Sequence, residues 1–405
     1  MKVANNTQLD VVEDSMKSEN LSITPEMLSL LGLDPRDFEG IDLENISLDS
    51  SDNESLVAIQ KIEQGVLRMS HHVPPEFEPI FQIFLKHESG NWGEGEINYS
   101  NYEKEVRDLH YENEGELKQI LRVLAFFLIG DAIVTRNIGT NFGEELGHHH
   151  VIRLMLESQL RFENIHAITY ASLVDHLPES VVSKKDKLEM KLSMLRCPRV
   201  KAIAEFMAEY MNPQTHSLSE RIFAFVILEY IIFAGCFCVI YNLKRKNKLE
   251  ALTQANSLIA RDETLHADNG IAMYHVLTKL GEIEPLDQSV AKEILAEGVK
   301  VTCDLMRYGM DIEIVGLDND DMETYIQSLA NEMYSSFFAS NVSATVHSGS
   351  AGIELPYPRA SNPFPWLVNM IVHQLSNFFE KKETNYIGTL VYQDSDDDDD
   401  DDVDF

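Results

Sequence analysis

Residues 161–170 read RFENIHAITY, and residues 260–270 read ARDETLHADNG. Both stretches belong to segments with helical periodicity. Each contains one Glu-x-x-His sequence: Glu163 with His166, and Glu263 with His266. Residues three apart lie on one face of a helix, so each pair presents a carboxylate and an imidazole toward the same point. One such pair is common by chance in a helical protein, whereas two pairs make the two helices candidates for the walls of one site.

Two further carboxylates lie in strongly apolar surroundings. Asp131 follows the apolar run of LRVLAFFLIGDAIV, residues 121–134, and Glu229 is the single charge in IFAFVILEYIIFAGCFCVIY, residues 222–241. The second stretch is long enough to cross a bilayer, but its central carboxylate and its amphipathic neighbours favour a helix buried inside a soluble bundle. A buried carboxylate needs a partner, which for either residue alone could be an Arg or a Tyr.

Together these residues have the composition of a two-metal site. Four carboxylates and two imidazoles on four helices match the inward-facing arrangement of ferritin-like di-iron and di-manganese bundles. This hard, anionic donor set suits two iron ions, or manganese, whereas zinc more usually takes a compact tetrahedral set richer in Cys or His. We therefore expect a ferritin-like di-metal helical bundle with additional helices.

Helical patterning extends along most of the chain. Helices are predicted at 102–112, 114–138, 143–175, 186–210, 218–246, 248–280, 287–315 and 321–346, with a last one near 366–380. No short runs rich in Val and Ile alternate with them, which favours an all-α fold over a parallel α/β sheet. The segment that begins at Val73 contains Pro74, Pro75 and Pro79, which argue against a long helix there. Three adjacent histidines, His148 to His150, would point in three directions on a helix, so we expect a partly exposed helical surface rather than a metal site.

The acidic charge is concentrated at the two ends of the chain. The 405 residues include 33 Lys and Arg against 67 Asp and Glu, a net charge of −34, and nine Asp lie in residues 394–405. We predict an extended acidic, partly disordered N-terminal arm over 1–72, a helical di-metal domain over 73–380 and a flexible acidic tail over 381–405. The scarcity of clustered Lys and Arg argues against nucleic-acid binding.

Cysteine usage and the start of the chain bear on its compartment. The four cysteines include no CxxC pair, which favours a reducing environment. No basic segment followed by an apolar stretch opens the sequence as a secretion signal would. The expectation is a cytoplasmic protein that does not span a membrane.

Four motifs resemble one known family, the small, radical-generating di-iron subunit of class I ribonucleotide reductase. FENIHAITY and IARDETLHAD are similar to its two metal helices, SNPFPWL (361–367) to a signature near the end of its bundle, and NFFEKKETNY (377–386) to the lead-in to its tail. The resemblance runs from about Glu76 to Phe405. It implies six metal ligands: Asp131, Glu163, His166, Glu229, Glu263 and His266.

The resemblance also implies that Tyr170 carries a tyrosyl radical generated with dioxygen. Tyr170 lies four residues after His166, one helical turn further on the same face, so its phenol can approach the metals. Phe233, Phe237 and Ile259 match the family's apolar radical pocket, although these residues would also suit an ordinary core.

A relay to a separate large subunit, where ribonucleotides are reduced, is a further implication of the resemblance. Trp92 resembles the relay tryptophan, Asp262 the acid that hydrogen-bonds a metal-ligating histidine, and Tyr386 the tail tyrosine, a role for which Tyr392 competes. An acceptor such as Asp262 is also expected because ligating imidazoles are normally oriented by one. The closing Asp404 and Phe405 resemble the end of the tail that docks into the large subunit, and the family forms homodimers.

The chain departs from the family pattern at several positions. Ala167, Tyr230 and Lys382 replace residues that are commoner there, and none of these changes removes a ligand or Tyr170. Two other functions stay open. One is a ferritin-like di-metal oxidase acting on its own bound substrate, and the other is an iron-binding helical protein without radical chemistry.

Overall fold

The structure, a computed structural model, describes residues 25–30, 35–38, 57, 61–62, 73–339 and 353–367. The chain divides into two compact units. The first contains residues 1–77 and 146–153, and its described elements include the short helix α2 (Pro25–Leu30) and the 3₁₀ turns η1 (Pro35–Phe38) and η2 (Pro75–Phe77). The predicted helix over 366–380 and the tail lie almost wholly outside the described residues, so the predicted domain limits stay predictions.

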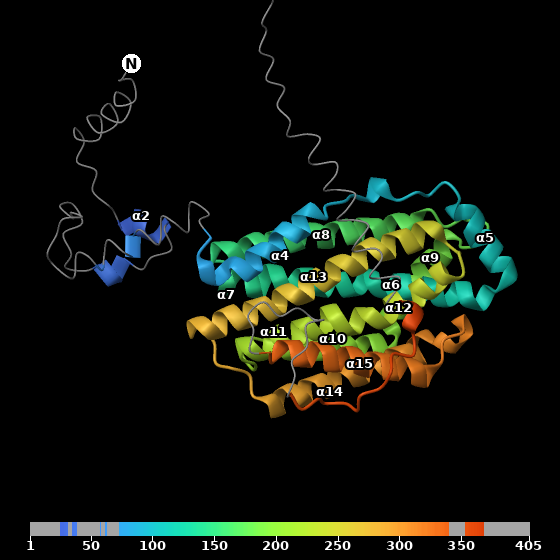
Figure 1. Cartoon of the computed structure of the whole chain (residues 1–405). Helices are drawn as coiled ribbons and strands as arrows, with labels where there is room; N and C mark the ends of the chain where they lie inside the picture. The colour runs from blue at the N-terminus through green and yellow to red at the C-terminus, as the bar shows by residue number, and fades with distance from the viewer. Residues whose placement is uncertain are drawn as a thin grey trace, which may run out of the picture. The chain divides into compact units, whose positions relative to one another are not determined.

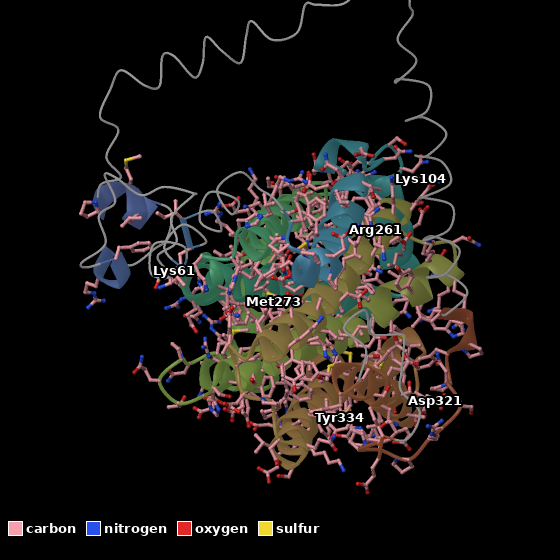
Figure 2. The ribbon with its side chains drawn as sticks, turned by 60° about the vertical axis from the view of Figure 1, so that its left-hand side comes forward. Lys61, Lys104, Arg261, Met273, Asp321 and Tyr334 are labelled. Carbon is pink, nitrogen blue, oxygen red and sulfur yellow. The ribbon has the colours of Figure 1, made fainter. Side chains whose placement is uncertain are left out.

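In the described part of the second unit, residues 78–145 and 154–405, all regular secondary structure is helical (Figure 1, and Figure 2 with the side chains). No strand occurs in residues 73–339 or 353–367, and the all-α expectation is confirmed. The helices and helical turns in chain order, with α7 and α8 crossing the limits of the units, are α4 (Glu78–Ser89), η3 (Glu94–Glu96), α5 (Tyr102–Glu112), α6 (Glu114–Asn137), η4 (Ile138–Phe142), α7 (Gly143–Leu146), α8 (His150–Asp175), α9 (Lys184–Arg196), α10 (Pro198–Tyr210), α11 (Leu218–Ile227), η5 (Leu228–Ile232), α12 (Phe233–Arg245), α13 (Glu250–Leu280), α14 (Gln288–Asp304), η6 (Leu305–Met310), η7 (Ile312–Val315) and α15 (Asn319–Phe337).

The strongly apolar segment forms one continuous helical run, α11–η5–α12, through the middle of this unit. Of the described residues, Leu218–Arg245 is the one helix long and apolar enough to cross a membrane, and 94% of its most apolar stretch is buried inside the protein. It packs against α13, α14 and α15. The expectation of a buried core helix is confirmed. Its centre is the π-helical turn η5, a distortion that is frequent at functional sites.

The helices that carry the two Glu-x-x-His pairs lie beside α4. Figure 1 shows α4, α8 and α13 side by side, α4 packs on α13, and His87 of α4 lies 2.9 Å from the Ser158 hydroxyl of α8. This arrangement brings the short N-terminal helix of the unit directly onto the predicted metal helices.

Several predicted boundaries were wrong for identifiable physical reasons. The segment 186–210 is two helices because Cys197 is extended before Pro198, which begins α10. Within the segment 287–315, helix α14 is followed by the π turn η6. The helical backbone then ends at Asp311, which has a left-handed φ of 49°. Pro79 does not prevent the 12-residue helix α4 because it lies in its first turn, where no backbone N–H is needed.

The histidine run is not a helical surface. His148 and His149 lie in the turn between α7 and α8, and His150 begins α8. His148 is exposed, whereas His149 and His150 are buried. The expectation of a partly exposed helix was therefore wrong for this run.

Candidate metal centre

The six predicted ligands converge inside the second unit. Each side chain is at most 2% exposed, and they come from four helical runs: Asp131 from α6, Glu163 and His166 from α8, Glu229 from η5, and Glu263 and His266 from α13. The spacing in each Glu-x-x-His pair places both groups on the inner face of one helix. The π turn contributes Glu229 from the middle of the apolar run.

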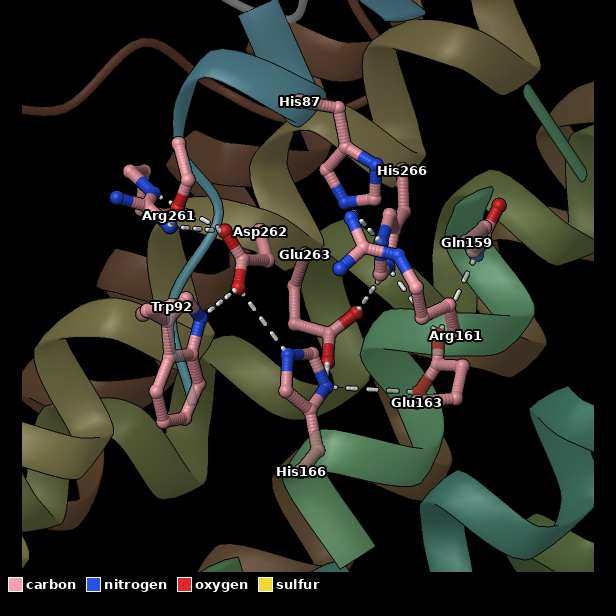
Figure 3. A network of polar contacts seen from close by, with 12 residues as sticks. His87, Trp92, Gln159, Arg161, Glu163, His166, Arg261, Asp262, Glu263 and His266 are labelled. Atoms are coloured by element: carbon pink, nitrogen blue, oxygen red, sulfur yellow. Dashed lines mark hydrogen bonds and ion pairs between the residues drawn. The ribbon is translucent and has the colours of Figure 1, made fainter. Parts of the chain in front are cut away.

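Short distances connect the two imidazoles to the carboxylates between them (Figure 3). Nδ1 of His166 lies 3.1 Å from Oε1 of Glu263 and 3.5 Å from Oε2 of Glu163. Nδ1 of His266 lies 2.8 Å from Oε2 of Glu263 and 3.2 Å from Oε1 of Glu163. Both rings therefore direct Nδ1 into the cluster, and two carboxylates lie between the two rings.

The donor atoms form two overlapping sets. One contains Asp131, Glu163 and His166, and the other contains Glu163, Glu229, Glu263 and His266, with the donor atoms of each set within 4.8 Å of one another. Glu163 belongs to both sets. Two cations that share a carboxylate fit this arrangement, and the predominance of oxygen donors favours iron or manganese.

Buried oxygen and nitrogen atoms that make no hydrogen bond indicate that the cluster suits cations. Within the described residues, five buried atoms of these side chains make no hydrogen bond of suitable geometry, although His166 Nδ1 and Glu263 Oε1 lie close together: Asp131 Oδ2, Glu163 Oε2, His166 Nδ1, Glu229 Oε2 and Glu263 Oε1. Burial and the charges of Glu163 and Glu263 raise the pKa of Asp131 and of Glu229 well above the ordinary value. So many buried carboxylates are costly without neutralisation, and bound divalent ions supply it.

Outside the cluster, His166 is oriented by Asp262. Its Nε2 lies 3.3 Å from Oδ2 of Asp262, which also accepts a 2.7 Å hydrogen bond from Nε1 of Trp92. Oδ1 of Asp262 accepts from Arg261 at 2.6 Å. Burial acts in the opposite direction, but the hydrogen bond with His166 and the charge of Arg261 hold the pKa of Asp262 below its ordinary value. The aspartate is therefore an anionic acceptor.

Tyr170 lies fully inside the protein next to this cluster. It is 1% exposed, and within the described residues its hydroxyl has no hydrogen-bond partner. Its ring stacks on Phe127 with centroids 4.9 Å apart and planes 7° apart. Phe237 in turn stacks on Phe127, with the two ring centroids 5.0 Å apart. The ring centroid of Phe233 lies 6.1 Å from that of Phe127 and 6.1 Å from that of Phe237.

The environment of Tyr170 keeps its phenol protonated. Burial raises the pKa of Tyr170 well above 10, and the charges of Asp131, Glu263 and Glu163 act in the same direction. Of these three charges, that of Asp131 has the largest effect. Ile259, the third predicted pocket residue, is fully buried. The surroundings are thus apolar on the ring side and acidic on the metal side.

Three residues of the site were not found from the sequence. Phe127 lies four residues before Asp131, a helical spacing that could have indicated a shared face. Gln159 lies four before Glu163, and its amide donates to Oε1 of Glu229 at 3.0 Å. His87 has no such signal in the sequence.

His87 contacts the second metal histidine. Its Nε2 lies 3.1 Å from Nε2 of His266, and the ring is fully buried. Burial lowers the pKa of His87 to about 2, and the nearby His266 adds to this effect. The ring is therefore a neutral imidazole. The three remaining predicted residues, Tyr386, Asp404 and Phe405, lie outside the described residues.

The fold and this donor set define a helical di-metal carboxylate protein. Comparison with known proteins gives the family. The family profile described as "Ribonucleotide reductase, small chain" matches residues 71–342. The ribonucleoside-diphosphate reductase small subunit of Plasmodium falciparum is 32% identical over 314 residues, which cover 77% of this chain and 89% of that protein. The chain belongs to the family of ribonucleotide reductase small chains.

Solved structures agree on the fold. The ribonucleotide reductase Rnr4 homodimer of Saccharomyces cerevisiae has a TM-score of 0.57 at 19% identity and covers 82% of this chain and 96% of that one. A dimanganese(II) NrdF of Streptococcus sanguinis has a TM-score of 0.55 at 18% identity and covers 72% and 95%. The role of the chain is that of the radical-generating small subunit of an oxidoreductase, built on a two-metal centre.

Proposed function

We propose that this subunit holds two iron ions and carries its radical on Tyr170, from which the oxidising equivalent passes to a large subunit that reduces ribonucleoside diphosphates to deoxyribonucleotides. The burial of Tyr170 beside both donor sets is the observation that carries the proposal. When bound, the iron ions would supply the oxidising power by reaction with dioxygen. The six ligands would be those described above, with Glu163 shared between the two ions.

The protein itself contributes a pocket that excludes water and keeps the phenol of Tyr170 protonated. The stacked ring of Phe127 and the neighbouring Phe233 and Phe237 exclude water from one side of Tyr170. Because its pKa is raised, the phenol keeps its proton until it is oxidised. Exclusion of water and reductants then protects the radical.

The hydrogen-bonded series His166, Asp262 and Trp92 supports a route out of the centre. It begins at a metal ligand and ends at an indole that is 3% exposed, with contacts of 3.3 and 2.7 Å. In this proposal Trp92 passes the equivalent toward the large subunit. Tyr386 continues the route, and Asp404 and Phe405 dock the acidic tail, whose charge would steer the encounter.

Assembly and location complete the proposal. A homodimer is proposed because the related Saccharomyces cerevisiae structure is one. The four cysteines, Cys197, Cys236, Cys238 and Cys303, are free thiols, which supports a reducing compartment such as the cytoplasm.

Reconstitution tests the radical assignment. Metal-free protein given ferrous iron and air should show a tyrosyl signal by electron paramagnetic resonance, with two irons per chain by metal analysis of the same sample. Tyr170→Phe should bind the same iron and give no signal, because only the hydroxyl is removed. A signal that persisted in Tyr170→Phe would place the radical on another residue. Loading with manganese in parallel tests the choice of metal.

Removing residues 386–405 separates this function from a self-contained di-metal oxidase. The truncated chain should keep iron and the Tyr170 signal but lose turnover with the large subunit. An oxidase that acts on its own bound substrate would keep full activity without these residues, and that result would overturn the proposed partnership.

A further inference from the structure

The two metal-site histidines are held from behind by different groups. Nε2 of His166 faces the carboxylate of Asp262 at 3.3 Å, whereas Nε2 of His266 faces another imidazole, Nε2 of His87, at 3.1 Å. Figure 3 shows His87 next to His266, whereas Trp92 lies beside Asp262. The contact with Asp262 belongs to the proposed radical route, whereas the contact with His87 does not.

The position of the protons decides the direction of the His87 contact. His266 directs Nδ1 toward Glu263 and Glu163, so Nδ1 must offer its lone pair to a cation, and the ring proton lies on Nε2. Two nitrogens 3.1 Å apart form a hydrogen bond only if one carries a proton and the other does not. His87 must therefore accept at Nε2 and carry its own proton on Nδ1.

The surroundings of His87 fit this tautomer. Nδ1 of His87 lies 2.9 Å from Oγ of Ser158, which can accept its proton. The Ser158 hydroxyl in turn donates to Oε1 of Glu88 at 2.5 Å, and this carboxylate oxygen also accepts from Arg161 at 2.9 Å. Each donor along this series has one acceptor, so a single direction satisfies every group from His266 to Glu88.

Packing holds the His87 ring in place. Its centroid lies 3.9 Å from that of Phe162, and the Arg161 guanidinium lies 4.5 Å from the centroid of the same Phe162 ring. The planes of His87 and His266 are inclined at 72°, so one ring presents an edge nitrogen to the other. A fixed acceptor of this kind restricts the rotation of the ligand ring that contacts it.

We propose that His87 is a positioning residue that fixes the tautomer and ring orientation of His266, and thereby sets the affinity of the metal position formed by Glu163, Glu229, Glu263 and His266. The position formed by Asp131, Glu163 and His166 depends on Asp262 instead. The two histidines thus face different acceptors, an imidazole in one case and a carboxylate in the other, and the two metal positions can be altered separately. The inference rests on the two-metal centre and not on the radical at Tyr170.

Titration of the metal-free full-length chain with Mn²⁺ tests this directly, with free Mn²⁺ counted by electron paramagnetic resonance. His87→Leu removes the acceptor and should weaken one of the two sites by about 10–100-fold, the usual effect of losing such a partner, while the other site keeps its affinity. His87→Gln retains an acceptor and should therefore lose clearly less affinity than His87→Leu. Rescue by Gln is the result that a purely structural role would not give.

Two controls keep the result interpretable. Ile83→Ala, one turn earlier on α4, removes buried packing without touching the hydrogen bonds, and should leave both affinities unchanged. Thermal unfolding of each metal-free variant shows whether it folds, and His87→Met replaces His87→Leu if the latter does not. Unchanged affinity at both sites in a folded Leu or Met variant, or equal losses for Gln and Leu, would overturn the proposal. Because the assay uses Mn²⁺ alone, its outcome is independent of the Tyr170 radical.

Discussion

Trp92 and Asp262, 170 residues apart in the sequence, are joined by a 2.7 Å hydrogen bond from the indole Nε1 to the carboxylate Oδ2. The same oxygen faces Nε2 of His166, while Oδ1 is held by Arg261. Asp262 is therefore fixed by three donors from three parts of the chain. Because Asp262 is held in this way, the roles of Trp92 and of Asp262 can be tested by separate mutations.

Replacing Trp92 tests the outward end. Trp92→Phe retains an aromatic ring in the buried position but removes the N–H donor and the readily oxidised indole. Metal content and the tyrosyl signal should be unchanged, whereas turnover with the large subunit should be lost. The measurement is deoxyribonucleotide formation alongside electron paramagnetic resonance of the same preparation. Full turnover in Trp92→Phe would exclude the proposed route.

Replacing Asp262 tests the inward end. Asp262→Asn keeps the shape but removes the charge that His166 and Arg261 share, and it should weaken the metal position of Asp131, Glu163 and His166 by about 10–100-fold. Loss of the buried ion pair with Arg261 should also destabilise the fold by about 3 kcal/mol. Mn²⁺ titration and thermal unfolding measure the two effects. Glu103→Gln, in an exposed ion pair on α5, is a control that should alter neither.

Much of the site could be predicted because its chemistry conflicts with its surroundings. Asp131 and Glu229 are recognisable as carboxylates in apolar helices, and each Glu-x-x-His pair is recognisable from helical spacing alone. The structure brings all six predicted ligands together, as that pattern implies.

The residues that were missed depend on packing between helices. His87 reaches His266 only because α4 lies on α13, and no periodicity within α4 encodes that contact. Gln159 likewise meets Glu229 through the arrangement of α8 and η5. The prediction of helix ends was wrong where one residue interrupts a helical pattern. Pro198 is an example, because the residue before it must be extended.

Gly130 provides a test of the Tyr170 pocket. A Cβ built at this position would lie 2.6 Å from Cε1 of Phe233, so Gly130→Ala must displace a ring that packs on Phe127. Overpacking of this kind costs about 1–3 kcal/mol, and the displaced ring should shorten the lifetime of the tyrosyl radical. The checks are thermal unfolding and the decay of the signal after reconstitution.

A matched variant separates the local effect from the general one. Gly93→Ala lies where a Cβ meets nothing within 4 Å, and should change neither stability nor radical lifetime. If Gly130→Ala lost stability but kept the normal decay rate, Phe233 would be an ordinary core residue and not part of a protective pocket.

Metal removal should make stability depend on pH near neutrality. Burial alone would lower the pKa of His266, but the charge of Glu263 and the hydrogen bond with Glu163 raise it to about 9 from 6.5. A raised pKa in the folded state contributes stability that is complete below 6.5 and is lost as pH rises toward 9. The raised pKa values of His166, Asp131 and Glu229 act in the same direction. Asp262 and Glu263, whose pKa values are lowered, are fully ionised in both states throughout this range and add no slope.

The metal-free chain should therefore melt at a lower temperature at pH 8.5 than at pH 6.5. Bound Mn²⁺ should reverse the trend, because cations compete with protons for the same donors and bind more tightly as pH rises. Melting curves with a chelator and with excess Mn²⁺ measure both slopes. His266→Gln removes one titrating group and should flatten the metal-free slope, whereas the exposed His148→Gln should leave it unchanged. The prediction fails if the melting temperature of the metal-free chain stays constant or rises between these pH values. In that case, bound protons would not stabilise the cluster when the cations are absent.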